Sequence, residues 1–215
     1  MNATAETITY DLLIENDSDE MSKLLGEVFA ERDPPAVAAG ITAPEFEAFV
    51  SLFCPKASAE GLTIVARSSV TGEMVGAMLA EDAGTAPPDT LDHISPTFAP
   101  VLDILGQLDA DYRSSTTIRP GEFVHLFLIG VAREFAGMGI AQQLVTRCLE
   151  NAVQKDYSRA ITEATNKTSQ QVFRKLGFVD RVQRSYADHR FEGQSFFTSI
   201  SDHGGPILMD KLLVE

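Results

Sequence analysis

The sequence feature that most constrains the fold is an apolar run that leads into two closely spaced glycines. The run EFVHLFLIGV (residues 122–131) is nearly continuous in apolar residues, which is typical of a strand buried on both faces. After AGMGIA (residues 136–141), an amphipathic helix is predicted over residues 139–154. Its apolar side consists of Ile140, Leu144, Val145, Cys148, Leu149 and Ala152. The chain therefore has to turn within a few residues from a buried strand into a helix that covers a sheet.

The glycine turn between these two elements is a candidate anion site. The first N–H groups of a helix lack partners within the helix, and together with the helix dipole they attract negative charge. Gly137 and Gly139 permit positive φ angles and place no side chain between a phosphate and the backbone. The turn has neither the GK[ST] ending of a Walker loop nor the spacing of GxGxxG. Taken alone, it fits a phosphate site and a plain packing turn equally well.

The rest of the chain alternates between strand-like and helix-like segments. Strands are predicted over residues 7–15, 61–68, 73–81, 157–165, 178–186 and 205–213, with the second and third joined as a hairpin. Further helices are predicted over residues 19–30, 42–54, 101–112 and 169–177. The order β-α-α-β-β-α-β-α-β-α-β-β predicts an α/β fold, with a mixed sheet and helices on its faces.

Some predictions concern the ends of helices and the connections between them. Asp17 or Ser18 is the expected N-cap of the first helix, which the prolines of ERDPPA (residues 31–36) break. Thr42 is the expected N-cap of the second helix, and Pro55 is expected to end it. The connection over residues 82–100 is long enough that a functional role is expected.

Composition and charge set broad limits on function. The 215 residues fit one domain over residues 1–215, with two small domains as the alternative. The formal net charge of −14 argues against nucleic-acid binding and mildly favours cationic substrates such as amines. No apolar run suits a transmembrane helix or a secretory signal, so we expect a cytoplasmic protein that is not inserted in a membrane. Cys54 and Cys148 are too few for a cysteine-based metal site, no metal is expected, and both are interpreted as buried apolar residues.

Residues 136–141 resemble the coenzyme A signature of the GNAT superfamily of N-acetyltransferases. That signature reads Arg/Gln-x-x-Gly-x-Gly/Ala after a strand that ends in valine. Gly139 and Ala141 match it, whereas Ala136 stands where the superfamily usually has arginine or glutamine. Arg133, three residues earlier, either supplies a positive charge instead or is a solvated loop residue.

A second segment, NKTSQQVFRKLGF (residues 166–178), is similar to a later motif of the superfamily. That motif reads Asn-x-x-Ala-x-x-x-Tyr-x-Lys-x-Gly-Phe. The positions that agree are Asn166, Lys175, Gly177 and Phe178. Ser169 replaces the alanine, and Phe173 replaces the tyrosine that usually serves as the acid. The two motifs have the order and the separation of the superfamily.

The resemblance implies a single GNAT-like domain whose central mixed sheet is mostly antiparallel and is flanked by helices on both faces. It also implies acetyl-CoA as the cofactor, with the backbones of Ile129 and Val131 beside its pantetheine arm. The other residues that it places at coenzyme A are Ala136, Gly137, Met138, Gly139, Ile140, Ala141, Asn166 and Phe173.

Within the superfamily, residues 162–178, 185–191 (SYADHRF) and 91–94 (LDHI) resemble the arthropod-type arylalkylamine N-acetyltransferases. The implied reaction is direct transfer of acetyl from acetyl-CoA to the primary amine of a small molecule, an arylalkylamine or a polyamine. We expect a monomer or a homodimer. His93, in the long connection, is a candidate substrate contact.

The candidate catalytic residues follow from the same resemblance. Thr165 and Ser169 have the spacing of two hydroxyl residues that are proposed to act with a glutamate after the first helix. Glu31 and Asp33 are available for the glutamate position, and we favour Asp33. Alternatively, Asp33 only starts a turn and Ser169 only caps a helix. His125 is the other candidate base, since an imidazole pKa near its ordinary value of about 6.5 suits a base that acts through water; the alternative is a packing residue.

Two other functions stay open at this point. The chain fits a protein or peptide N-acetyltransferase, which would act on peptides alone. The departures at Ala136 and Phe173 also fit a catalytically weak, acyl-CoA-binding regulatory domain.

Overall fold

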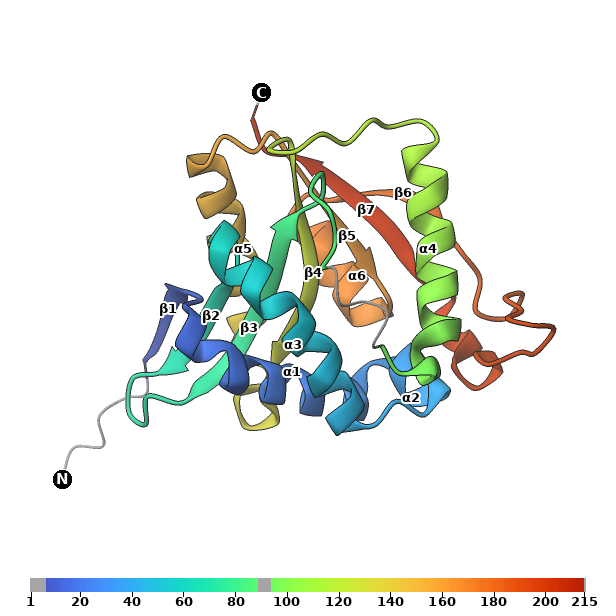
Figure 1. The fold of residues 1–215 in the computed structure, drawn as a ribbon, viewed down its shortest axis with the longest axis horizontal. Coiled ribbons are helices and arrows are strands. Elements are labelled where there is room, and N and C mark those ends of the chain that lie inside the picture. The colour runs from blue at the N-terminus through green and yellow to red at the C-terminus, as the bar shows by residue number, and fades with distance from the viewer. Residues whose placement is uncertain (1–6, 89–93, 215) are drawn as a thin grey trace.

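A seven-stranded sheet lies at the centre of the computed structural model, which describes residues 7–88 and 94–214 (Figure 1). Its strands are β1 (Ile8–Leu12), β2 (Ile64–Ser68), β3 (Met74–Asp82), β4 (Phe123–Val131), β5 (Arg159–Ala164), β6 (Val179–Gln183) and β7 (Ile207–Leu212). Their order across the sheet is β1-β2-β3-β4-β5-β7-β6. Among these strands β4 and β5 run parallel, and the other neighbours pair antiparallel. The predicted mixed, mostly antiparallel sheet is confirmed.

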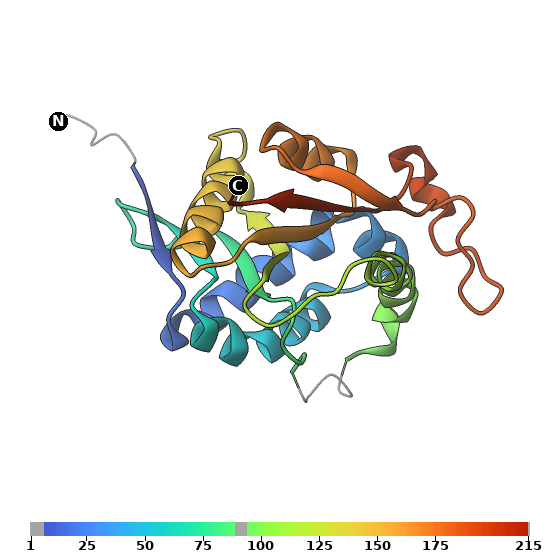
Figure 2. The ribbon, with the colours of Figure 1, turned by 90° about the horizontal axis from the view of Figure 1, so that it is seen from above.

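Helices cover both faces of the sheet. They are α1 (Ser18–Arg32), α2 (Pro34–Ala39), α3 (Ala43–Glu60), α4 (Ala99–Arg113), α5 (Ile140–Gln154) and α6 (Lys167–Lys175). Figure 2 shows α5 and α6 on one face, with α1, α3 and α4 on the opposite face. Helices on both faces are what the α/β order of the sequence predicted.

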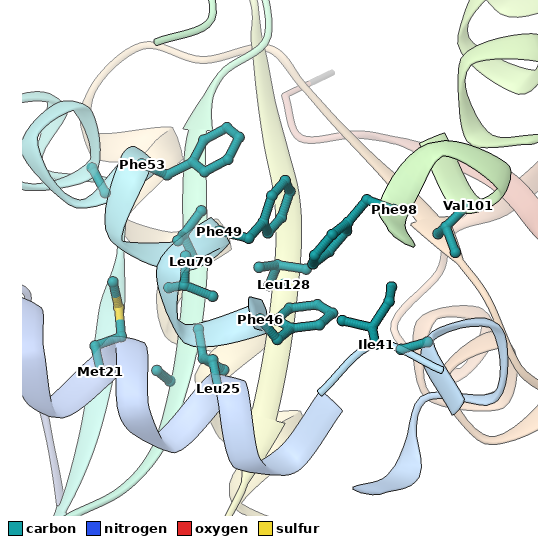
Figure 3. Close-up of a cluster of buried hydrophobic side chains, with 14 of the residues drawn as sticks. Met21, Leu25, Ile41, Phe46, Phe49, Phe53, Leu79, Phe98, Val101 and Leu128 are labelled. Carbon is teal, nitrogen blue, oxygen red and sulfur yellow. The ribbon is translucent and has the colours of Figure 1, made fainter. Parts of the chain in front are cut away.

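Each face of the sheet has its own hydrophobic core. On the face of α1 and α3, the rings of Phe46, Phe49 and Phe53 project from successive turns of α3 (Figure 3). Phe49 stacks on Phe98 with ring centroids 4.7 Å apart. On the other face α5 buries all six residues of its predicted apolar side: Ile140, Leu144, Val145, Cys148, Leu149 and Ala152. Their spacing near 3.6 residues keeps them on one side of the helix.

The prolines after α1 begin a helix as well as ending one. α1 ends within ERDPPA as predicted, at Arg32 and two residues beyond the predicted end, but the short helix α2 starts at Pro34 and was missed. Proline suits the first position of a helix, because its missing N–H would have no partner there. Asp33 is extended at φ −81° and ψ 115°, and its Oδ2 accepts a hydrogen bond from Ala36 N at 3.3 Å. The carboxylate therefore caps α2 and is fixed at the junction of the two helices.

Pro55 does not end α3, contrary to the prediction. Thr42 caps the start of the helix as predicted, but the helix continues to Glu60 and stops before Gly61, which is left-handed at φ 60°. A proline inside a helix removes one backbone hydrogen bond. The turn that contains Pro55 also buries Ala57, which is 1% exposed. Phe53, Cys54 and Ala57 are buried on either side of the exposed Pro55, and this burial offsets the missing hydrogen bond.

Both cysteines are buried and free, as predicted. Burial raises the pKa of the Cys148 thiol to about 12, so this thiol stays protonated at neutral pH. Within residues 7–88 and 94–214, no helix is long and apolar enough to cross a membrane.

Candidate active site

The strands β4 and β5 part near the centre of the sheet. They pair only through residues 123–125 of β4 and residues 159–161 of β5. At the point of separation, Thr162 Oγ1 donates a hydrogen bond to Leu126 O at 2.9 Å, so a side chain takes the place of a backbone donor. Beyond it, β5 continues beside β7 while β4 continues beside β3. The sheet is therefore open between β4 and β5.

A bulge lies in β4 at the same place. Leu79 pairs with Leu128 and the next residue, Ala80, pairs with Leu126, which leaves Phe127 as an extra residue in β4. Bulges interrupt the ladder and re-aim side chains. Here Phe127 joins the aromatic cluster of α3, with its ring centroid 4.9 Å from that of Phe53.

The edge of β4 that faces the opening presents backbone groups that no neighbouring strand of the described residues pairs. Ala132 N donates to Val75 O at 2.8 Å, so these two residues form a hydrogen-bonded pair of the β3–β4 ladder. Antiparallel pairs alternate, and Ile129 and Val131 therefore direct their N–H and C=O groups away from β3. Val131 O accepts a hydrogen bond from the Arg32 guanidinium. An extended ligand can add to this edge in the manner of another strand.

The turn after β4 has two left-handed glycines, as predicted. Gly137 has φ 81° and Gly139 has φ 78°, and a Cβ at either position would have no heavy atom within 4 Å. No side chain in the described part of the protein caps α5, so the N–H groups of Ile140 and Ala141 are available to a ligand. Open space, free amides and the positive end of the helix dipole together form an anion site.

A cavity of about 360 Å³ lies where β4 and β5 part. Residues of α1, α3 and α4 line it on one face of the sheet, and residues of α6 line it on the other. Six phenylalanines form much of its wall: Phe29, Phe46, Phe49, Phe98, Phe127 and Phe173. Figure 3 shows three of them, Phe46, Phe49 and Phe98, gathered between α3 and the start of α4. The volume and the aromatic lining are those of a small-molecule site.

Asp33 is a buried carboxylate in the wall of this cavity. Its Oδ1 accepts a hydrogen bond from Thr165 Oγ1 at 2.7 Å, and its Oδ2 is engaged by Ala36 N. Burial raises the pKa of Asp33 to about 6, although the hydrogen bonds from Thr165 and Ala36 act in the opposite direction. At neutral pH the group is ionised, yet it is a stronger base than an ordinary aspartate.

The two candidate hydroxyl residues lie on either side of the first residue of α6, and both line the cavity. Asn166 caps this helix, with Oδ1 accepting from Ser169 N at 2.9 Å. Ser169 Oγ donates to Asn166 O at 2.9 Å, so Ser169 belongs to the helix cap as well as to the cavity wall. Asp33 and Thr165 come together from positions 132 residues apart in the chain.

His125 is held between two carboxylates. Its Nε2 lies 2.6 Å from Glu163 Oε2 and its Nδ1 lies 3.3 Å from Glu81 Oε1. Burial by itself lowers the pKa of His125, but Glu163 and Glu81 outweigh it and raise the pKa to about 10. The expectation of an ordinary imidazole pKa was wrong. His125 is a cation at neutral pH, and it would have to lose this proton before it could act as a base.

The other acid of the ERDPPA segment faces away from the cavity. Glu31 is half exposed and pairs with Arg133, with Oε1 and Nη1 2.6 Å apart. Arg133, considered above as a source of positive charge for a phosphate, is therefore engaged at the surface. Of Glu31 and Asp33, only Asp33 lines the cavity.

Phe173 has no hydroxyl to offer and is almost fully buried. It is 2% exposed and packs edge-to-face on Phe178, with centroids 5.1 Å apart. Ala136 and Met138 are exposed beside the glycines of the turn. His93 lies outside the described residues.

Sequence analysis missed one acidic residue of the cavity. This residue is Glu163, which lines the cavity. Phe46 and Phe49 also line the cavity, although the sequence indicated only that their rings are buried. The side chains of a strand alternate between its faces, so the segment TEAT places Glu163 on the same side as Thr165. This alternation was the available signal for Glu163.

A family model described as the acetyltransferase (GNAT) family matches residues 59–178, which is more than half of the chain. The chain belongs to this family. The matched region runs from the end of α3 to Phe178 and includes the open edge of β4, the glycine turn and α6. The family inferred from residues 136–141 and 166–178 is thus confirmed.

Solved structures with the same fold extend the likeness over nearly the whole GNAT chain. The C-terminal condensation domain of Ebony, solved with β-alanyl-dopamine, has a TM-score of 0.87 at 15% identity, with 96% of this chain and 99% of that chain covered. Arylalkylamine N-acetyltransferase 2 from Aedes aegypti has a TM-score of 0.81 at 20% identity, with 97% and 100% covered. A polyamine N-acetyltransferase from Drosophila melanogaster has a TM-score of 0.77 at 17% identity, with 96% and 100% covered. A comparison with curated proteins finds no match.

Proposed function

We propose that this protein transfers the acetyl group of acetyl-CoA to the primary amine of a small aromatic amine. The observation that carries the proposal is the buried Asp33–Thr165 pair in a cavity walled by phenylalanines. A protonated amine needs an anion at its nitrogen, and its aromatic ring needs apolar walls. The cavity offers both, and the net charge of −14 favours the approach of a cation.

Asp33 is the residue we assign to the amine nitrogen. As a carboxylate it pairs with an ammonium group, and with a pKa of about 6 it can accept a proton from that group more readily than an ordinary aspartate. Thr165 Oγ1 fixes the orientation of Asp33 Oδ1, and the cap on Ala36 N fixes Oδ2. Both oxygens are thus held in place before the amine binds, which lowers the entropy cost of reaching the reactive geometry.

The residues present fit coenzyme A at the other side of the opening. Acetyl-CoA supplies the acetyl group as an activated thioester. The outer edge of β4 suits the two amides of a pantetheine arm, because the described strands of the sheet leave both backbone groups of Ile129 and the N–H of Val131 unpaired. The turn around Gly137 and Gly139 suits a pyrophosphate. Ala136, Met138, Ile140 and Ala141 complete this turn, whose contribution is backbone amides.

Two groups near α6 complete the assignment. Phe173 contributes an apolar surface, so a proton for the leaving group has to come from another residue. Ser169 lines the cavity and has a hydroxyl hydrogen, which it now donates to Asn166 O. We assign to Ser169 the proton-donating role that the tyrosine usually has in this superfamily, and to Asn166 the positioning of Ser169.

The experiment is a thiol-release assay with acetyl-CoA and a panel of acceptors. The panel contains 2-phenylethylamine, tyramine, putrescine, agmatine and peptides with free N-termini. We expect release of CoA thiol with the aromatic amines. Release with peptides alone would replace the proposal by peptide acetylation. Binding of coenzyme A by calorimetry without release on any acceptor would make the protein an acyl-CoA-binding domain.

A further inference from the structure

Glu163 is a second carboxylate in the cavity wall, and one of its oxygens is unused. Oε2 accepts from His125 Nε2 at 2.6 Å, whereas Oε1 has no hydrogen-bond partner within the described part of the chain. The side chain is only 12% exposed, so most of it is shielded from bulk water. A carboxylate oxygen in this position can accept a hydrogen bond from a ligand in the cavity.

The partners of Glu163 form a buried chain of alternating charges. Lys56 Nζ lies 2.6 Å from Glu81 Oε2, Glu81 bonds His125, and His125 bonds Glu163. The charges of these four groups cancel. Glu60 Oε1 lies 3.8 Å from Lys56 Nζ, at the end of this row of charged groups that is farthest from the cavity. The negative charge of Glu163 is therefore already balanced by its own neighbour.

This balance determines what kind of ligand group fits at Glu163. A second ammonium placed there would be buried beside a carboxylate that is already neutralised by an imidazolium, and burying an uncompensated charge is costly. A neutral hydroxyl can donate one hydrogen bond to Oε1 and leaves no charge uncompensated. Phe127 lies beside this position, with its ring centroid 5.2 Å from that of His125, so an aromatic ring can carry the hydroxyl.

Glu163 lines the same cavity as the residues assigned to the amine. Glu163 precedes Thr165 by two residues, and Thr165 holds the Asp33 carboxylate. Residues two apart in a strand project from the same side of it. One small molecule in the cavity can therefore contact both Asp33 and Glu163.

We propose that Glu163 selects arylalkylamines with a ring hydroxyl, which it binds through Oε1 while Asp33 binds the amine nitrogen. This rests on the proposed function, because it assumes that the cavity is the amine site. Glu163 thereby becomes a specificity-determining residue, and His125 is the residue that holds its carboxylate in place.

The test compares tyramine with 2-phenylethylamine, which lacks only the ring hydroxyl. For the wild-type protein we expect kcat/KM to be about 10- to 100-fold higher with tyramine, the range of one hydrogen bond to a charged group. In Glu163→Gln the preference should disappear through a higher KM for tyramine, with 2-phenylethylamine affected by less than about threefold. Glu81→Gln is the matched control, because it removes a carboxylate from the same histidine but outside the cavity wall; it should keep the preference.

Several outcomes would overturn the inference and leave the proposed function standing. These are equal wild-type kcat/KM values for the two amines, an equal loss for both in Glu163→Gln, or a preference for agmatine or putrescine that Glu163→Gln abolishes. If Glu163→Gln does not fold, the wild-type preference and Glu163→Asp, which keeps the charge on a shorter side chain, decide the question. Acetyl transfer to no amine at all would instead contradict the proposed function.

Discussion

The glycine turn before α5 and the acidic cavity beside α2 offer a ligand two different kinds of chemistry. The turn and the β4 edge come from one short segment, residues 129–141, and present mainly backbone groups. The cavity draws its wall from α1, α3, α4, β4, β5 and α6, and its polar groups are side chains. Its central contact, Asp33 to Thr165, joins residues 132 positions apart.

Because of this difference, we expect the glycine turn and the cavity to respond differently to substitution. Backbone amides are supplied by any residue that can adopt the required φ and ψ, so we expect the turn to bind a phosphate even with Ala136 in place of arginine or glutamine. The cavity depends on particular carboxylates, hydroxyls and rings, which have no backbone substitute. Substitutions in the turn should therefore change mainly the affinity for coenzyme A, and substitutions in the cavity mainly the turnover of the amine.

The largest effect is expected at Asp33. Asp33→Asn keeps an oxygen that can cap Ala36 N but removes the base, so kcat with an aromatic amine should fall about 10²- to 10⁴-fold. The affinity for coenzyme A, measured by calorimetry, should change by less than about twofold. Glu31→Gln provides the comparison, because Glu31 is the neighbouring acid that lies outside the cavity. A larger loss in Glu31→Gln than in Asp33→Asn would reverse the assignment of the base.

The second largest effect is expected at the glycine turn, on the affinity for coenzyme A. Gly139→Leu forces a side chain into a left-handed position and fills the open space over the turn, so the affinity for coenzyme A should fall about 100-fold. Gly72, in the β2–β3 hairpin, has the same φ of 78° and the same open surroundings. Gly72→Leu carries the same backbone strain and should retain the wild-type affinity. Equal losses in the two variants would show that strain, and not the phosphate site, is responsible.

The pH dependence of activity distinguishes the amine cavity from the coenzyme A site without any mutation. The pKa of Asp33 is raised to about 6, so kcat/KM for the amine should fall about tenfold per pH unit below pH 6 as the carboxylate becomes protonated. The affinity for coenzyme A should not decrease in the same way below pH 6. An acid limb with a midpoint near 4, or one that persists unchanged in Asp33→Asn, would contradict the role of Asp33.

The same pKa shift predicts an effect on stability with a definite sign. The folded-state pKa of Asp33 lies above the ordinary value of 3.8, so its protonated form stabilises the fold below about pH 4, and this contribution is lost as the pH rises through about 6. From pH 5 to pH 8 the wild-type free energy of unfolding should therefore fall about 1 kcal/mol more than that of Asp33→Asn. Urea unfolding at the two pH values measures this difference. A change in the opposite direction would mean that Asp33 is not a buried carboxylate.

The smallest expected effect is a gain in the affinity for coenzyme A. Ala136 is exposed and extended at φ −62° and ψ 143°, so arginine fits there without strain. Ala136→Arg should tighten coenzyme A binding about two- to fivefold at low salt, and the gain should shrink as salt is added. Thr71→Arg adds the same charge in a distant hairpin and should leave the affinity unchanged. An equal gain in Thr71→Arg would assign the effect to net charge.

Local sequence patterns predicted most of the fold because they depend on local physics. The apolar spacing of residues 140–152 placed α5 and all of its buried side chains, and the glycines at 137 and 139 predicted the left-handed turn. The two failed predictions have different causes. Pro55 is tolerated inside α3 because its neighbours Cys54 and Ala57 are buried in the core. The helix α2 follows from local signals, the Asp33 cap and a proline at the first position, which had been interpreted only as the end of α1.

The sequence by itself determined the family, the order along the chain of the strands and of every α-helix but α2 among the described residues, and the backbone turn before α5, since each of these is carried by neighbouring residues. Only the tertiary structure decided which acid lies in the cavity, because Asp33 and Glu31 are two residues apart yet point into different surroundings. It also decided that His125 is an ion-paired cation, since Glu81 and Glu163 reach it from neighbouring strands and their charges outweigh the effect of burial on its pKa. Contacts between distant segments set the pKa values, and the pKa values set the chemistry that each residue can perform.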